Sequence, residues 1–184
     1  TVCGDDWALK VEYGVVRAMV VDGLGHGAHA AAAAAAARAV WQGEHQTRSP
    51  VETLQAAHTA LRATRGATMA VAWLDHANKI VRYAGVGNIG AAILTPQLKS
   101  RNLVSSNGTV GMELRRLQEF QYPITDEDTF IMYSDGITSH WRLEQYPGLM
   151  QRHPGVIAGA IYRDYRRGRD DATVVVVKLA AASA

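Results

Sequence analysis

The stretch that decides the fold is VVRAMVVDGLGHG (residues 15–27), followed by an alanine tract over residues 28–37 that only His29 interrupts. The first seven residues are mostly β-branched or otherwise apolar, which is typical of a buried strand. This strand leads into Asp22-Gly23 and a glycine-rich turn. Alanine has the highest helix propensity, and its small side chain allows close packing. The sequence therefore predicts a strand, an acidic turn and a buried helix, in that order.

The segments on either side extend this pattern. Residues 7–11 form a second β-rich run, and Tyr13-Gly14 between the two runs predicts a hairpin. Helices are expected at residues 51–63 and 154–166. Further short apolar runs predict strands at residues 68–74, 80–84, 91–94, 117–122, 129–133 and 174–179. Because the helices are segregated from the strands, the pattern favours two antiparallel sheets with helices outside over a βαβ repeat.

Length and composition indicate one domain. The 184 residues are 48% apolar and 20% charged, with a formal charge of +2, so we expect a single globular domain over residues 1–184. The spread of charge does not suggest nucleic-acid binding, and no apolar run approaches the roughly 20 residues of a membrane span. One cysteine, Cys3, fits a reducing compartment. We expect a cytoplasmic protein that binds neither nucleic acid nor membrane. Because Thr1 is not preceded by methionine, we also expect that the sequence lacks a short natural N-terminal segment.

Four aspartates share one feature, which is that each lies at a predicted strand end or in the adjoining turn. They are Asp5, Asp22, Asp135 and Asp170. Carboxylates gathered at one rim of a sheet would repel one another unless divalent cations lay between them. Oxygen ligands without a zinc-type cysteine or histidine pattern favour Mg²⁺ or Mn²⁺. The alternative interpretation is that Asp-Gly merely marks turns.

The glycine-rich turn also admits a dinucleotide-binding interpretation. Gly23, Gly25 and Gly27 lie between a strand and a helix, and Glu44 follows about twenty residues later. Three features weigh against it: the third glycine falls one place early, the segment around Glu44 is polar, and Asp22 would face the pyrophosphate with a negative charge. A dinucleotide-binding enzyme therefore stays an alternative, not the favoured function.

Four segments in a fixed order resemble those of a known family. They are VVDGLGHG (residues 20–27), YAGVGN (83–88), IMYSDGI (131–137) and DDATVVVV (170–177). This order resembles the PPM-type metal-dependent serine/threonine phosphatases, and within them the bacterial SpoIIE-type branch. CGD (residues 3–5) and the compact length are similar to the RsbX-like stress-response members.

The resemblance implies an α/β sandwich (α-β-β-α) with a centre for two divalent cations, Mn²⁺ or Mg²⁺, at one end of the sheets. Asp22 would bridge the two ions, and the carbonyl of Gly23 would bind one of them. Asp5, Asp135 and Asp170 would complete the set of ligands.

The neighbouring acidic residues Asp6 and Asp171 would then not be primary ligands, although each pair could shift by one position. Some relatives place a histidine directly after Asp-Gly as a candidate general acid, whereas this chain has Leu24 there and His26 two places later. His26 is therefore the candidate catalytic acid, with capping of the following helix as the alternative.

The implied activity is hydrolysis of phosphoserine or phosphothreonine on a bacterial regulatory protein by a metal-activated water. We expect the partner to be a phosphorylated STAS-domain protein of a sigma-factor or stressosome switch. Four arginines near Asp170 could orient an acidic partner or simply form a solvated surface; they are Arg163, Arg166, Arg167 and Arg169. A non-catalytic phosphatase-like module that binds a partner is the other alternative, and its expected signature is loss of metal-binding aspartates.

Overall fold

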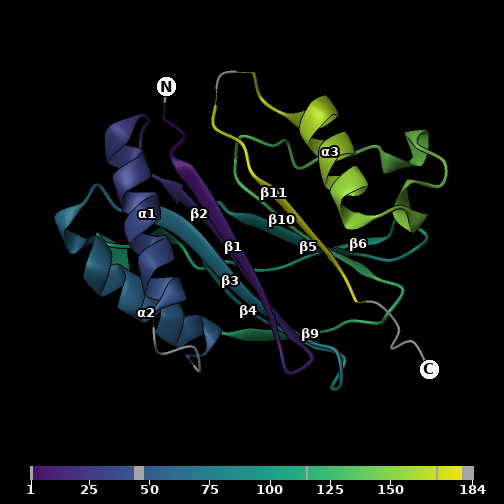
Figure 1. The fold of residues 1–184 in the computed structure, drawn as a ribbon, viewed down its shortest axis with the longest axis horizontal. Helices are drawn as coiled ribbons and strands as arrows, with labels where there is room; N and C mark the ends of the chain where they lie inside the picture. Colours follow the sequence, from purple (N-terminus) through teal and green to yellow (C-terminus); the bar gives the residue numbers. More distant parts are fainter. Residues whose placement is uncertain (1, 44–47, 115, 169, 180–184) are drawn as a thin grey trace.

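The computed structural model describes residues 2–43, 48–114, 116–168 and 170–179, which form four layers (Figure 1). Helices α1 and α2 cover one sheet, and helix α3 covers the other. The first sheet has the order β1-β2-β3-β4-β9 and the second β11-β10-β5-β6. All pairs within these two sheets are antiparallel. The predicted α-β-β-α sandwich is confirmed.

The elements have the following bounds. The first sheet contains β1 (Asp5–Glu12), β2 (Val15–Gly23), β3 (Ala67–Asp75), β4 (Ile80–Val86) and β9 (Phe120–Pro123). The second contains β5 (Gly90–Leu94), β6 (Ser100–Asn102), β10 (Thr129–Tyr133) and β11 (Val174–Lys178). The helices are α1 (Ala28–Gln42), α2 (Pro50–Ala60) and α3 (Pro154–Tyr165), and β7 (Gly108–Thr109) pairs with β8 (Glu113–Leu114).

Both faces of β2 are buried, which explains its continuous apolar sequence. Ala18 and Val20 belong to the core between the two sheets, together with Tyr83 and Phe130. Met19 and Val21 on the opposite face belong to a second core, under α1 and α2. A third core fills the space between the second sheet and α3. The strand that leads to Asp22 is therefore held from both sides.

Helix α1 is buried on one side only, so the expectation of a buried helix was too strong. Its buried residues are Ala30, Ala33, Ala34 and Ala37, whereas Ala32 and Ala35 are exposed. The helix lies in an outer layer and covers a sheet with one face. Alanine allows a close approach there: a Cβ built on Gly23 would lie only 2.1 Å from the carbonyl oxygen of Ala30.

The remaining differences from the predicted elements are local. The helix expected at residues 51–63 is α2 followed by a 3₁₀ turn at Leu61–Ala63, and a capping box between Ser49 and Glu52 fixes its start. Strand β9 begins at Phe120, later than expected. Strands β6, β7 and β8 were not predicted, because they are short and β6 is exposed throughout, so that no apolar alternation marks it. None of the described helices is long and apolar enough to cross a membrane.

Enlarging the inner face of α1 should destabilise the protein. We expect Ala33→Leu to lower the free energy of unfolding by about 1–3 kcal/mol, because extra methyl groups have no space between helix and sheet. Ala35→Leu, on the exposed face of the same helix, should change it by no more than about 0.5 kcal/mol. Urea unfolding followed by circular dichroism measures both. Equal losses in the two variants would contradict the packing described here.

Candidate active site

Three polar side chains form a row across the end of the first sheet. Asp5 in β1 is paired directly with Asp22 in β2, and Asp22 is paired with Thr68 in β3. Directly paired residues of antiparallel strands present their side chains on the same face, with Cβ atoms about 4.5–5.5 Å apart. Asp22 has the same parity along β2 as Val20, which belongs to the core between the sheets. The row therefore closes one end of the space between the sheets.

The second sheet contributes the turn after β10 and the segment before β11. The hydroxyl of Ser134 donates a hydrogen bond to Oδ2 of Asp5 (2.6 Å) and accepts one from the amide of Thr173 (2.9 Å). A Cβ on Gly136 would lie 1.8 Å from the carbonyl oxygen of Asp171, so only glycine allows the two segments to pass this closely. These contacts join the two sheets where the acidic residues lie.

A cavity of about 220 Å³ opens between these segments. Its lining comprises Asp22, Leu24, Gly25, Thr68, Asn88, Asp135 and Asp170. The structure thus brings three of the predicted aspartates, from both sheets, to one cavity. Asn88, between β4 and β5, donates a hydrogen bond from Nδ2 to Oδ2 of Asp135 (2.7 Å) and fixes the orientation of that carboxylate.

The other predicted site residues lie around the cavity. Asp5 lies beside Asp22 and is held by Ser134, and Gly23 is buried beneath α1. His26 is exposed and does not line the cavity. The N-cap of α1 is Gly27, with no side-chain hydrogen bond at that end, so the alternative role of His26 as a helix cap is not observed.

Each acidic pair has one member that is engaged elsewhere. Asp171 accepts a hydrogen bond from the amide of Gly4 (2.6 Å), and Asp170 is the member that lines the cavity. Asp6 accepts a hydrogen bond from Arg38 (2.7 Å). The ligand roles expected for Asp5 and Asp170 stay predictions.

Burial and like charges perturb the acids of the site. The pKa of Asp22 is raised to about 7, first by burial and then by the charges of Asp5, Asp135 and Asp170. Burial also raises the pKa of Asp5, against the hydrogen bonds from Ser134 and Thr173 that lower it. The carboxylates are therefore close enough to resist simultaneous ionisation.

The donor set fits divalent cations by its chemistry, but it is not a pre-formed cage. Among the described residues, no three His, Cys, Asp or Glu side chains form a group that could hold a metal ion as they stand. Carboxylates that raise one another's pKa nevertheless form the environment that a hard cation relieves. The hydroxyl oxygen of Thr68 is buried and has no hydrogen-bond partner within the described part of the chain. The site thus has oxygen ligands and an unsatisfied polar group.

Comparison with known proteins decides the family. The family model described as Stage II sporulation protein E (SpoIIE) matches residues 12–180. The chain belongs to the SpoIIE family. The expected PPM-type, SpoIIE-branch resemblance is confirmed, while a search of curated proteins gives no match.

In this SpoIIE-family chain β2 pairs antiparallel with both β1 and β3, so the parallel βαβ unit needed by the dinucleotide-binding alternative does not occur there. Glu44, on which that alternative also depended, lies outside the described residues.

Solved structures share the fold over most of their length. A structure from work on the bacterial stressosome, described as a modular system adapted to control secondary messenger signalling, is 29% identical, with a TM-score of 0.81 over 95% of this chain and 90% of that one. RsbX in complex with magnesium is 19% identical, with a TM-score of 0.78 over 96% and 86%. The PP2C phosphatase domain of SpoIIE from Bacillus subtilis, with a fragment of its regulatory domain, is 19% identical, with a TM-score of 0.73 over 100% and 60%.

Sequence reasoning missed two residues of the SpoIIE-family site. Asn88 stands within YAGVGN (residues 83–88), but its role as the partner of Asp135 depends on a turn between two sheets. Thr68 belongs to no motif, and only its pairing with Asp22 brings it to the cavity. A polar residue at the start of an otherwise apolar strand was the one available signal.

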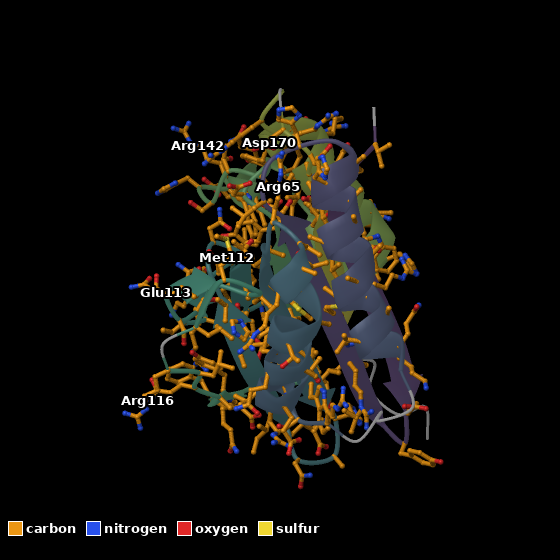
Figure 2. All side chains as sticks on the ribbon, turned by 90° about the vertical axis from the view of Figure 1, so that its left-hand side faces the viewer. Arg65, Met112, Glu113, Arg116, Arg142 and Asp170 are labelled. Carbon is orange, nitrogen blue, oxygen red and sulfur yellow. The ribbon has the colours of Figure 1, made fainter. Side chains whose placement is uncertain are left out.

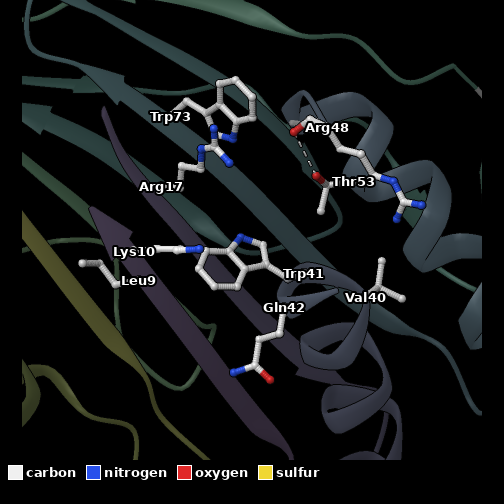
Figure 3. Close-up of a pocket in the computed structure, with 9 residues that line it drawn as sticks. All are labelled: Leu9, Lys10, Arg17, Val40, Trp41, Gln42, Arg48, Thr53 and Trp73. Carbon is white, nitrogen blue, oxygen red and sulfur yellow. Dashed lines mark hydrogen bonds between the residues drawn. The ribbon is translucent and has the colours of Figure 1, made fainter. Parts of the chain in front are cut away.

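A second cavity, of about 200 Å³, lies on the helix side of the first sheet (Figure 3). Trp41 and Trp73 line it together with Lys10, Arg17 and Arg48. The guanidinium of Arg17 lies 4.3 Å from the centre of the Trp73 ring. None of the predicted site residues lines this cavity, and Arg17 precedes Asp22 by five strand positions, or roughly 17 Å. The two cavities are separate.

The raised pKa of Asp22 predicts how the metal-free protein responds to pH. The raised pKa means that protonated Asp22 favours the folded state. Its contribution to the free energy of unfolding is complete below pH 3.8, the ordinary pKa of aspartate, and is lost as pH rises through about 7. We therefore expect wild-type protein in chelator to lose stability, relative to Asp22→Asn, between about pH 4 and pH 7. Urea unfolding at a series of pH values measures the difference. If the difference in free energy of unfolding between wild type and Asp22→Asn does not vary with pH, burial and the neighbouring charges do not raise the pKa of Asp22.

Proposed function

We propose that this chain is a protein serine/threonine phosphatase, formed by a single domain over residues 1–184. Homology to PP2C-type phosphatases supports the enzyme class. The observation that carries the proposal is the convergence of Asp22, Asp135 and Asp170 on one open cavity, next to Asp5. A non-catalytic phosphatase-like module would not need to keep these mutually repelling acids together.

In this proposal Asp5, Asp22, Asp135, Asp170 and the carbonyl of Gly23 hold two divalent cations, Mg²⁺ or Mn²⁺. Such ions, when bound, activate a water for attack on phosphorus and neutralise the charge of the phosphoryl group. The surrounding residues keep the carboxylates in place. Asn88 orients Asp135, and the chain of hydrogen bonds through Ser134 orients Asp5.

His26 is the proposed general acid for the leaving serine or threonine oxygen. It is exposed on the loop beside the cavity, between Gly25 and Gly27, which have φ values of 93° and 73°. These backbone conformations favour glycine, so the loop can turn sharply at the cavity rim. Imidazole can deliver a proton near neutral pH.

The proposed substrate is a phosphorylated regulatory protein of the STAS type. At about 220 Å³ the cavity is smaller than the roughly 300–1,000 Å³ of pockets that enclose small ligands. A phosphate presented on a protein surface fits such a site. The arginines near Asp170 give weaker support, because Arg163 pairs with Asp164 (2.6 Å) and Arg166 lies 5.4 Å from the Tyr162 ring. Arg169 lies outside the described residues.

Activity should depend on divalent metal and on the folded partner. We expect Mn²⁺ or Mg²⁺ to support phosphate release from a phosphorylated STAS-domain protein, and excess chelator to abolish it. A denatured peptide with the same phosphosite and an aryl phosphate serve as comparison substrates. Full turnover in chelator would refute the metal mechanism. Higher kcat/KM for a phosphorylated metabolite than for the folded protein would refute only the substrate.

The acidic pair before β11 provides a matched test of the ligand set. We expect Asp170→Asn to lower kcat by more than about 100-fold, since changes even to residues behind the ligands of a metal site typically cost 10–100-fold. Asp171→Asn should cost less than about tenfold, because the amide oxygen of asparagine can still accept the hydrogen bond from Gly4. The measurement is steady-state turnover at saturating Mn²⁺. The reverse order would place the metal ligand at residue 171.

A further inference from the structure

Among the described residues, those that line the candidate active-site cavity carry no positive charge. Its three carboxylates, when ionised, contribute only acceptors, and one of the two amide hydrogens of Asn88 is directed at Asp135. A phosphate monoester carries about −1.5 to −2 charges at pH 7. Beyond what bound cations neutralise, its non-bridging oxygens need hydrogen-bond donors from the protein.

Arg65 stands at the rim of the cavity on a fixed turn. The hydroxyl of Thr64 donates to the carbonyl of Leu61 (2.7 Å) and accepts from the amide of Gly66 (3.0 Å). The carbonyl of Gly66 in turn accepts a hydrogen bond from the amide of Leu24 (3.0 Å). This last bond joins the turn that carries Arg65 to the glycine-rich loop of the site, so the backbone of Arg65 is well positioned.

The guanidinium of Arg65 lies against the cavity lining. A Cβ built on Gly25 would be 3.1 Å from Nη1 of Arg65, and Gly25 is one of the lining residues. Arg65 is exposed, and within the described part of the chain no hydrogen bond or ion pair engages its side chain. Figure 2 shows Arg65 at the same end of the molecule as Asp170. The charge is thus available to a ligand in the cavity.

Thr68 lines the cavity and carries a second donor, a hydroxyl whose oxygen is itself buried. The residue is only 9% exposed, and this oxygen has no hydrogen-bond partner among the described residues. A Cβ on Gly87 would lie 2.4 Å from its methyl carbon, so that methyl group packs closely under the turn that carries Asn88. An unpaired buried hydroxyl costs roughly 1–3 kcal/mol. A ligand that accepts its hydrogen bond would recover that cost.

We propose that Arg65 and Thr68 form the subsite for the phosphoryl group of the substrate, which rests on the phosphatase function proposed above. The guanidinium binds non-bridging oxygens from the rim, and the Thr68 hydroxyl donates from the inner wall beside Asp22. Arginine suits this role because its planar donors match phosphate oxygens and its charge persists at every working pH. The expected ligand class is a phosphate monoester dianion, with inorganic phosphate as the product that binds in the same place.

The test compares Arg65→Met with Arg62→Met. Arg62 is an exposed arginine in the 3₁₀ turn Leu61–Ala63, shortly before Arg65, and it does not line the cavity. In Mn²⁺-loaded protein we expect Arg65→Met to raise both KM for an aryl phosphate and the dissociation constant of inorganic phosphate by about 10–100-fold, as for a lost charge-assisted hydrogen bond. Arg62→Met should match the wild type. Calorimetric titration with phosphate gives the affinity without turnover.

Two further variants test Thr68. Thr68→Val should weaken phosphate binding at least about fivefold, whereas Thr68→Ser should retain it, because only the hydroxyl is required. Loss of Mn²⁺ affinity in Thr68→Val with unchanged phosphate affinity would overturn its assignment. Arg65→Met with the phosphate affinity of Arg62→Met would overturn that of Arg65. If the wild type releases no phosphate from any substrate with either metal, the proposed phosphatase function itself fails, independently of these variants.

Discussion

The arrangement of the site depends on one constraint: several carboxylates are held close together at the end of a packed sandwich. Asp22 shows the consequence most clearly, since burial and the charges of three other aspartates raise its pKa to about 7. A cluster of this kind opposes folding at neutral pH unless something neutralises it. The rest of the fold supplies the stability that keeps it in place. Apolar cores on both sides of β2 fix the strand, so Asp22 near its end has little freedom to move away from the other carboxylates.

The two sheets approach each other at the site through hydrogen bonds and through positions that only glycine can occupy. Ser134 connects Asp5 of the first sheet to Thr173, directly before β11 of the second. Gly23 lets α1 rest on the acidic turn, and Gly136 lets the turn after β10 pass the segment before β11. Side chains at these positions would separate the layers and with them the carboxylates. The glycines of the Asp-Gly motifs therefore act through packing as well as through turn geometry.

The same geometry separates chemical roles within the cavity. Carboxylates from both sheets form the part suited to cations, whereas Arg65 and Thr68 come from the segment that leads into β3. The hydrogen bond between Leu24 and Gly66 places that segment beside the glycine-rich loop. An acidic metal site can thus lie next to hydrogen-bond donors for an anion. In a small cavity this arrangement suits a phosphate carried by a larger molecule.

The sequence by itself determined the order of the elements and two antiparallel sheets with helices outside, because periodicity and turn chemistry are local patterns. The family and the α-β-β-α class followed from the resemblance of four ordered motifs, which are also local in the sequence. The sequence also predicted four aspartates, three of which the structure brings to one cavity. Only the tertiary structure decided that α1 is buried on one face, that Asn88 holds Asp135, and that His26 lies outside the cavity lining. Arg65 and Thr68 belong to no motif and reach the site through the pairing of β3 with β2 and a loop contact. Such contacts between segments distant along the chain follow from strand register and layer packing, which no local pattern of residues encodes.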